Sequence, residues 1–405
     1  MDVVLTDWAS LCLRWLHVVA GIAWIGSSFY FMHLDYSLKP KGDLPAGASG
    51  EAWQVHGGGF YNMVKFLVAP TRMPDELTWF KWEAYTTWLS GFALLVVTYY
   101  VGASLFLIDP AVLAISPYAA SGISAGSLLV GWLVYHYACR SALGRNTGLL
   151  LGLGFVFLVA LCYGFTRVYS GRGTFLEMGA MIGTIMVANV FFVIIPNQKK
   201  VVAALLKGET PDPALGAEAK LRSTHNNYLT LPVVLVMIGN HYPLMFGTRY
   251  NWIIFALVLV VGAVIRHFFN ERHKGHPSPW WTWVVAAVGM AIIVWLSAVG
   301  AQISITAAAA AQPKATMAQV DDIVAARCSV CHMPQPVWDG FVAPPKGVLL
   351  DTPEHIALHA REIEIQAVLS NAMPPGNASD ISLADRRTIA AGLAHSGLVD
   401  NGFLR

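Results

Sequence analysis

In the stretch 147-TGLLLGLGFVFLVALCYGFT-166, no side chain carries a charge. A run of about 20 mostly apolar residues is long enough for an α-helix to cross a hydrocarbon core of ~30 Å. Inside a membrane, only a helix or a closed barrel satisfies every backbone hydrogen bond. The stretch therefore predicts a transmembrane helix.

The rest of the chain repeats this pattern. Hydrophobic residues make up 56% of it and charged residues only 12%, which is about half the charged share of a soluble protein. The first apolar run contains Arg14 and lacks a small-residue cleavage site, so it predicts a retained helix and not a signal peptide. We expect an all-α fold with an eight-helix transmembrane bundle, whose spans are 8–32, 82–107, 121–139, 147–166, 174–195, 228–246, 250–268 and 282–302.

The basic residues predict which end of the bundle faces the cytoplasm. One set of connecting loops holds 14 Lys and Arg residues, and the alternate set holds only 3. The first set comprises 33–81, 140–146, 196–227 and 269–281, and the second 108–120, 167–173 and 247–249. Because basic loops stay in the cytoplasm, both termini are expected outside, in the periplasm if this is a bacterial inner membrane. A net charge of +2 excludes a nucleic-acid partner and leaves the lipid bilayer as the expected surroundings.

A second domain is expected after the bundle. Residues 303–316 form a linker rich in small residues, and the composition of 317–405 is ordinary and polar. This tail contains the pattern C-x-x-C-H at Cys328, Cys331 and His332, which is typical of covalent c-type haem attachment. A zinc site would need two further ligands, and a thioredoxin-like pair would need a strand–helix–strand context. We therefore predict one haem c, with His332 as an axial ligand of the iron.

The second axial ligand is predicted by elimination. Met317 precedes the first tail helix, and Met333 is too close to His332 to reach the opposite face of a haem. Met373 remains, in a loop stiffened by two prolines, and a His/Met pair raises the reduction potential. The alternative ligands in the tail are His355, His359 and His395.

The tail is predicted to be a small helical domain. Its helices are expected at 317–328, 353–370 and 382–396, where Ser382 and Asp385 mark the last N-terminus. This pattern resembles a class I cytochrome c. The resemblance implies an electron carrier without a substrate pocket of its own.

Ionisable side chains inside the membrane mark candidate functional positions, because burying them in lipid is costly. His17 is expected near mid-membrane and His241 toward the outer face. A polar cluster is expected at the cytoplasmic face, made of His33, His136, His225 and His267, with Arg266, Lys81, Glu83 and, in the first loop, His56 and Arg72 nearby. The alternatives are neutral histidines bonded to carbonyl groups and, for Arg266, a side chain that reaches to the interface.

Several motifs together resemble one family. They are HVVAGIAWIG from His17, HGGGFYNMVKFLVAP from His56, FKWEAYTTWLSGF from Phe80, HNNYLTLP from His225 and NHYP from Asn240. With the C-terminal haem motif, they are similar to the bacterial membrane-bound urate hydroxylases, the cytochrome c-linked urate oxidases of purine degradation. The motif members that the resemblance offers for urate are His17, Lys81, Glu83, His225, Asn226, Asn227, Asn240 and His241.

The resemblance implies oxidation of urate to 5-hydroxyisourate without hydrogen peroxide. Electrons would pass to the fused haem c and on to a respiratory-chain cytochrome oxidase or a soluble cytochrome c. If urate bound at the cytoplasmic face, electrons would have to cross ~30 Å of hydrocarbon. Two solutions stay open: a haem b relay in the membrane domain, or a urate site near the outer face beside His17 and His241. The alternative function is a membrane-anchored cytochrome c that relays electrons for another dehydrogenase or quinol-oxidising complex.

Overall fold

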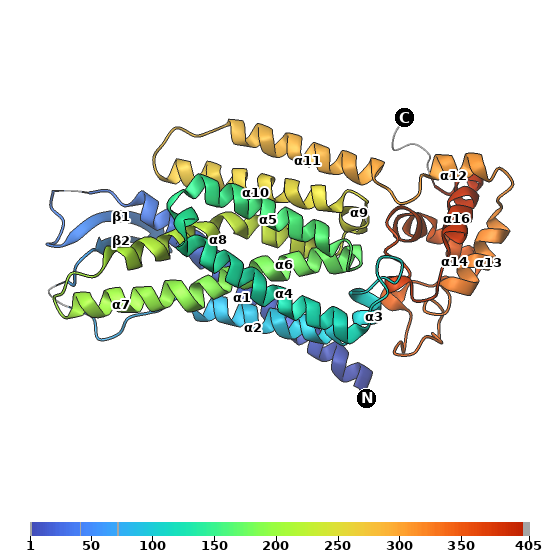
Figure 1. The fold of residues 1–405 in the computed structure, drawn as a ribbon, viewed down its shortest axis with the longest axis horizontal. Helices are drawn as coiled ribbons and strands as arrows, with labels where there is room; N and C mark the ends of the chain where they lie inside the picture. Colours follow the sequence, from blue (N-terminus) through green and yellow to red (C-terminus); the bar gives the residue numbers. More distant parts are fainter. Residues whose placement is uncertain (1, 41, 71–72, 400–405) are drawn as a thin grey trace.

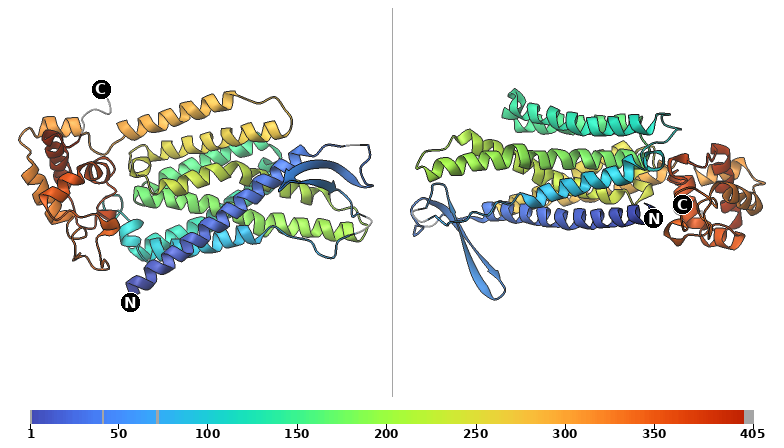
Figure 2. Two further views of the ribbon diagram at one scale, coloured as in Figure 1. Left: turned by 180° about the vertical axis from the view of Figure 1, so that it is seen from behind. Right: turned by 90° about the horizontal axis from the view of Figure 1, so that it is seen from below.

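The computed structural model describes residues 2–40, 42–70 and 73–399. Long, roughly parallel helices form a bundle, and the C-terminal tail packs against one end of it (Figure 1). The start of the first helix lies at this tail end, and a β-hairpin projects from the opposite end (Figure 2). This placement agrees with the alternation of loops that the charges predict.

Within the described ranges, six helices are long and apolar enough to cross a membrane. Their outer surfaces are apolar: Trp15, Val156 and Val284, for example, are each more than half exposed. An apolar surface of this extent needs lipid around it, so the protein is a multi-pass membrane protein. The six are α1 (Asp2–Ser37), α4 (Pro117–Arg140), α5 (Thr147–Phe165), the continuous helix Gly171–Leu206, α10 (Asn251–His273) and α11 (Trp281–Val299).

The other two predicted spans belong to the bundle but are not among these six. The first is α2 (Trp82–Leu95), which continues through a π-helical turn at Val96–Tyr100 and ends in α3 (Ala103–Phe106). The second is α8 (Pro213–Gly239), followed by the short α9 (Pro243–Phe246). That these two elements cross the membrane stays a prediction.

The expectation of a long cytoplasmic loop at 196–227 was wrong. The helix α6 (Gly171–Asn189) continues through a π-helical turn at Val190–Ile194 into α7 (Ile195–Leu206). With α8 it forms a helical hairpin, so His225 and its neighbours lie on a helix. Polar residues are tolerated there because the two helices bury them against each other.

The expectation of an all-α fold was also wrong in one place. Strands β1 (Ala48–His56) and β2 (Gly59–Phe66) form an antiparallel hairpin within the long first loop. Gly57 and Gly58 make its two-residue turn, with φ angles of +58° and +80° that favour glycine. The motif that begins at His56 therefore contains the turn of this hairpin.

The tail contains the three expected helical regions. They are α13 (Met317–Arg327), the run from α14 (Pro353–Leu358) through α15 (Ala360–Ile363) and a π-helical turn (Glu364–Leu369), and α16 (Leu383–Ser396), which Ser382 and Asp385 cap. The linker, however, is not extended, because it contains α12 (Ile305–Ala311), which packs against α16. The bundle and the tail each have an apolar core of their own, and the division into two domains stays a prediction.

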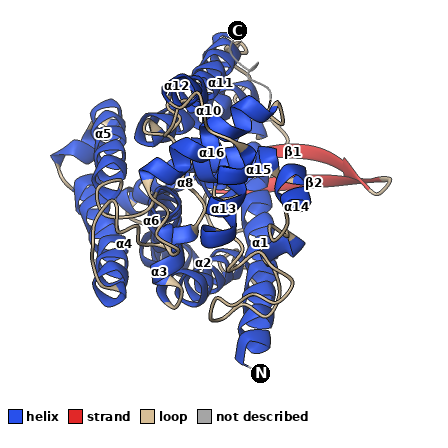
Figure 3. Ribbon diagram, turned by 90° about the vertical axis from the view of Figure 1, so that its right-hand side faces the viewer, coloured by secondary structure: helices blue, strands red, loops and turns tan. Residues whose placement is uncertain are grey.

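The tail sits on the end of the bundle (Figure 3). It contacts α3 and α9 there. The backbone N–H of Gln302 donates to the carbonyl of Leu369 (3.0 Å), and its side chain donates to the carbonyl of Gly247 (2.7 Å). A side chain at Gly376 would overlap the carbonyl oxygen of Ser104 on α3. The two backbones touch only because residue 376 is glycine.

Candidate functional site

One cavity of about 800 Å³ extends from the tail into the tail-facing end of the bundle. On the tail side it is lined by Cys328, Cys331, His332 and Met373. On the bundle side it is lined by polar and aromatic residues of α1, α2, α6 and the loop after α8. The tail and the bundle thus share one interior space, which we call the shared cavity.

The tail side fits a c-type haem. The Nδ1 of His332 donates to the carbonyl of Val348 (3.0 Å), which orients the imidazole and leaves Nε2 free, as is usual for a metal-ligating histidine. Burial raises the pKa of Cys328 to about 11 and also raises that of Cys331, so both are neutral thiols. Among the described residues, no group of three or more His, Cys, Asp and Glu side chains could hold a metal ion. This disfavours the zinc alternative.

Met373 lies on the wall of the same cavity, as its predicted role requires. Its backbone N–H donates to the carbonyl of Gln366 (2.9 Å), and its own carbonyl accepts from Arg386 (2.8 Å). Of the alternative ligands, His359 also lines the cavity, whereas the Nδ1 of His355 pairs with Asp351 (2.7 Å). The remaining alternative, His395, bonds to the carbonyl of Ala315 (3.2 Å).

On the bundle side, His17 of α1 faces α2. Its Nδ1 lies 2.9 Å from the carbonyl oxygen of Thr87, so Nδ1 carries the proton and Nε2 is the free, basic nitrogen. The ring packs over Gly91, where a Cβ atom would come within 2.7 Å of it. A small residue on α2 thus makes room for a histidine that lines the cavity.

An amide, two aromatic rings and a cation complete this side of the cavity. Asn240 donates to the hydroxyl of Tyr99 (2.7 Å), and its buried Oδ1 has no hydrogen-bond partner among the described residues. The rings of Trp88 and Phe92 are stacked with centroids 5.2 Å apart. Arg172 lines the cavity and has no carboxylate within ion-pair distance in the described ranges. Such a set can hold a flat, polar anion, as stacking, hydrogen bonding and charge all act on one ring.

Residues 3–297 match the family described as Urate oxidase N-terminal, which covers the whole bundle. The protein belongs to this family. Membership suggests an oxidoreductase with a role in urate oxidation. No curated protein and no solved structure matches the chain significantly.

The family's motif members in this chain fall into separate places. His17, Asn240 and His241 line the shared cavity, as the second of the two open solutions requires. His225, Asn226 and Asn227 lie about 20 Å away along α8, since 13 to 15 residues at ~1.5 Å each separate them from Asn240. The remaining two, Lys81 and Glu83, lie at the start of α2. This is the end of the bundle from which the β-hairpin projects, called the hairpin end below, and Lys81 lies over the ring of Trp82 (5.3 Å).

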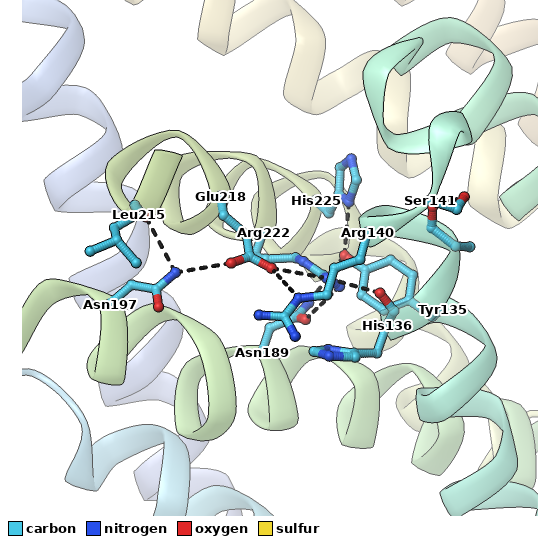
Figure 4. Close-up of polar contacts among 11 residues, drawn as sticks. Tyr135, His136, Arg140, Ser141, Asn189, Asn197, Leu215, Glu218, Arg222 and His225 are labelled. Carbon is cyan, nitrogen blue, oxygen red and sulfur yellow. Dashed lines mark hydrogen bonds and ion pairs between the residues drawn. The ribbon is translucent and has the colours of Figure 1, made fainter. Parts of the chain in front are cut away.

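A second polar cluster surrounds Arg222 at the hairpin end of this urate oxidase family member (Figure 4). The Arg222 side chain is fully buried, lies 3.7 Å from Glu218 and bonds to Asn189 (3.4 Å) and to the carbonyl of His136 (3.2 Å). Tyr135 and the Nδ1 of His225 are 2.8 Å apart. Arg222, which the sequence placed in a loop, bonds to the backbone carbonyl of His136 and lies over the ring of Tyr135, the partner of His225.

The other cytoplasmic-face candidates belong to local contacts. Arg266 bonds to Asn227 (3.2 Å) and Asn270 (3.0 Å) and is buried, so the expectation that it reaches to the interface was wrong. The Nδ1 of His267 lies 3.1 Å from the hydroxyl of Tyr228, and the ring of His33 lies 4.4 Å from that of His273. Finally, His56 is exposed on the β-hairpin, and Arg72 lies outside the described residues.

Sequence reasoning missed several members of the shared cavity, namely Arg172, Trp88, Phe92 and Tyr99. Arg172 was counted only as a loop charge, although it lies in the first turn of α6. A basic residue in the loops that otherwise carry few charges could have marked Arg172 as a candidate site residue. The aromatic residues offered no such signal, because their spacing is that of any packed membrane helix.

Proposed function

We propose that this protein oxidises urate to 5-hydroxyisourate in the shared cavity and passes the electrons to a haem c held by the tail. The observation that carries the proposal is that one cavity is lined both by Cys328, Cys331, His332 and Met373 and by His17, Asn240 and Arg172. Membership of the Urate oxidase N-terminal family supports urate as the substrate. The tail would face the periplasm of a bacterial inner membrane, where a soluble cytochrome c or a cytochrome oxidase can accept the electrons.

The overall reaction adds water and removes two electrons: urate and one water give 5-hydroxyisourate, two protons and two electrons. Arg172 attracts the urate anion, and the free Oδ1 of Asn240 accepts a hydrogen bond from a ring N–H. The stacked pair of Trp88 and Phe92 offers an aromatic surface to the purine plane. The Nε2 of His17 takes a proton from the ring, since Nδ1 already donates to Thr87.

The residues of the tail supply the other half of the reaction. Cys328 and Cys331 would attach the haem, and His332 and Met373 would bind its iron. A c-type haem accepts one electron at a time, so each urate needs two transfers. Because the substrate-binding side and the haem-binding side share one cavity, electrons need not cross the membrane and no haem b relay is required.

A relay module without its own substrate is the alternative function. Such a module would not need an unpartnered amide oxygen and an unpaired arginine in the wall of its haem cavity. The membrane domain places both an amide oxygen and an arginine without partners in the cavity wall, which favours an enzyme over a relay module.

The test measures urate absorbance and reduction of added cytochrome c with the detergent-solubilised, full-length protein. His17→Ala and Asn240→Leu should each lower kcat/KM by at least about ten-fold, the loss of one base or of one buried hydrogen bond. His56→Ala, on the exposed hairpin, is the matched control and should not change it. Normal turnover in both cavity variants would overturn the placement of the site. The loss of a covalent haem band in the Cys328→Ala, Cys331→Ala double variant tests the cofactor separately.

A further inference from the structure

A second cavity of about 440 Å³ opens beside the first, at the same end of the bundle. Its walls come from the loops after α3, α5 and α9 and from the tail segment around Ser370–Gly376. We call it the vestibule. Leu105, Phe106, Arg172 and Pro375 line both the vestibule and the shared cavity, so the two spaces meet at these residues.

The vestibule gathers the basic residues of the loops at this end of the bundle. The loops 108–120, 167–173 and 247–249 hold three Lys or Arg residues in all, which are Arg167, Arg172 and Arg249. All three line the vestibule. Membrane proteins keep few basic residues on the non-cytoplasmic side, so three that converge on one opening need a reason.

None of these three arginines has a carboxylate within ion-pair distance in the part of the chain that the structure describes. Each lies over an aromatic ring instead. The guanidinium carbon of Arg167 is 5.0 Å from the centroid of Tyr163, that of Arg249 is 5.8 Å from Tyr250, and that of Arg172 is 5.5 Å from Phe246. The aromatic faces orient the guanidinium groups but do not neutralise their charge.

The vestibule contains one carboxylate, that of Asp109. Its Oδ1 accepts a hydrogen bond from the backbone N–H of Ala111 (2.9 Å), within its own turn. Three positive charges against one negative charge leave a positive field at the opening. An anion on the tail side is therefore drawn toward Arg172, where the vestibule meets the shared cavity.

We propose that the vestibule is the entrance through which the substrate anion reaches the shared cavity from the tail side of the membrane, with Arg167 and Arg249 as positioning residues. The inference rests on the proposed function for the identity of the anion, urate. It adds a direction of entry and two residues that act before the substrate meets the reacting groups. Arg172 then receives the anion from the two outer arginines.

At the hairpin end of the bundle, the two buried arginines have polar partners. Its buried arginines, Arg222 and Arg266, are bonded to Asn189 and Asn227, and Arg222 has Glu218 beside it. Their charges are engaged in holding helices together. Arg167 and Arg249 are exposed and donate to neutral oxygen atoms, the hydroxyl of Tyr163 (2.7 Å) and the carbonyl of Ala301 (3.4 Å), so their charges can still attract an anion from solution.

The experiment uses the solubilised full-length enzyme with the double variant Arg167→Gln, Arg249→Gln. We expect KM for urate to rise about ten-fold, about three-fold for each exposed charge, with kcat within about two-fold of the original. Raising the ionic strength should weaken urate capture by the original enzyme and affect the double variant less. The matched control is Arg145→Gln with Lys207→Gln, two exposed basic residues of the opposite end, which should leave KM unchanged.

Two further measurements separate this inference from the proposed function. Xanthine lacks the C8 oxygen of urate and is an anion at a pH above its first pKa. At such a pH its equilibrium binding should weaken about ten-fold in the same double variant, and this measurement does not depend on turnover. In sealed vesicles, externally added urate should reduce the protein's own haem only where the tail faces outward. If no preparation oxidised urate but xanthine binding still depended on the two arginines, the proposed reaction would be rejected. The vestibule would still be supported as the entrance for an anion. Unchanged KM and unchanged xanthine binding in the double variant, or equal reduction in both vesicle orientations, would overturn the entrance.

Discussion

Replacing Arg386 should loosen the loop that carries the predicted methionine ligand. Arg386 is buried in the tail and donates to the carbonyl groups of Ala367 and Met373 and to the side-chain oxygen of Asn377 (3.3 Å). No carboxylate lies within ion-pair distance of it among the described residues. Its guanidinium group therefore ties α16 to the loop through hydrogen bonds.

The size of the effect follows from two opposing terms. Burial lowers the pKa of Arg386 to about 10, so the group remains charged at neutral pH, at a desolvation cost of about 3 kcal/mol. The variant Arg386→Met removes this cost but leaves three oxygen atoms, one buried and two partly buried, without this donor, at about 2 kcal/mol each. The net loss is about 3 kcal/mol in the free energy of unfolding of the tail. Arg387→Met is the matched control, because the neighbouring arginine is exposed.

The assay combines chemical unfolding with haem spectroscopy on the full-length protein. Arg386→Met should lower the unfolding midpoint of the tail, weaken the near-infrared sulfur-to-iron band and lower the reduction potential, while the covalent haem stays attached. The loss of potential separates a role in positioning Met373 from a merely structural one. The reasoning is refuted if Arg386→Met and Arg387→Met unfold alike and keep the same band and potential.

Three further changes test other parts of the structure. Gly376→Val should separate the tail from α3, because the new side chain would overlap the carbonyl of Ser104. Hydrogen exchange at α3 should then rise and turnover should fall, while the haem band stays intact. Arg222→Met should destabilise the bundle by about 2–4 kcal/mol, because the oxygen atoms of Asn189 and His136 lose their buried donor while Glu218 keeps Arg140. The unfolding temperature in detergent should fall, and an unchanged temperature would contradict this. Burial and two neighbouring carboxylates raise the pKa of Asp321, so the folded tail holds this proton more tightly than the unfolded one and loses stability as pH rises through that pKa. Asp321→Asn should therefore stabilise the tail more at pH 7 than at pH 4, and an equal gain at both pH values would argue against the titration.

Much of the organisation can be predicted from local sequence. Apolar runs of about 20 residues predict membrane helices because the backbone has no other way to satisfy its hydrogen bonds there. The three helical regions of the tail follow from caps such as Ser382 and Asp385. Consecutive glycines at 57 and 58 favour a turn, but they do not predict the β-hairpin around it. The pairing of two strands depends on contacts between them, which the pattern of residues along one strand does not show.

What the sequence alone determined is the membrane class, the alternation of the loops and the C-x-x-C-H motif, each of which depends on residues close together in the chain. Which polar residues work together was decided only by the tertiary structure. His17 and Asn240 line one cavity with Met373, whereas His225 lies on the same helix as Asn240 but about 20 Å away. The physical reason is the rise of a helix: residues of one motif separate along its axis, and packing between helices brings distant residues together.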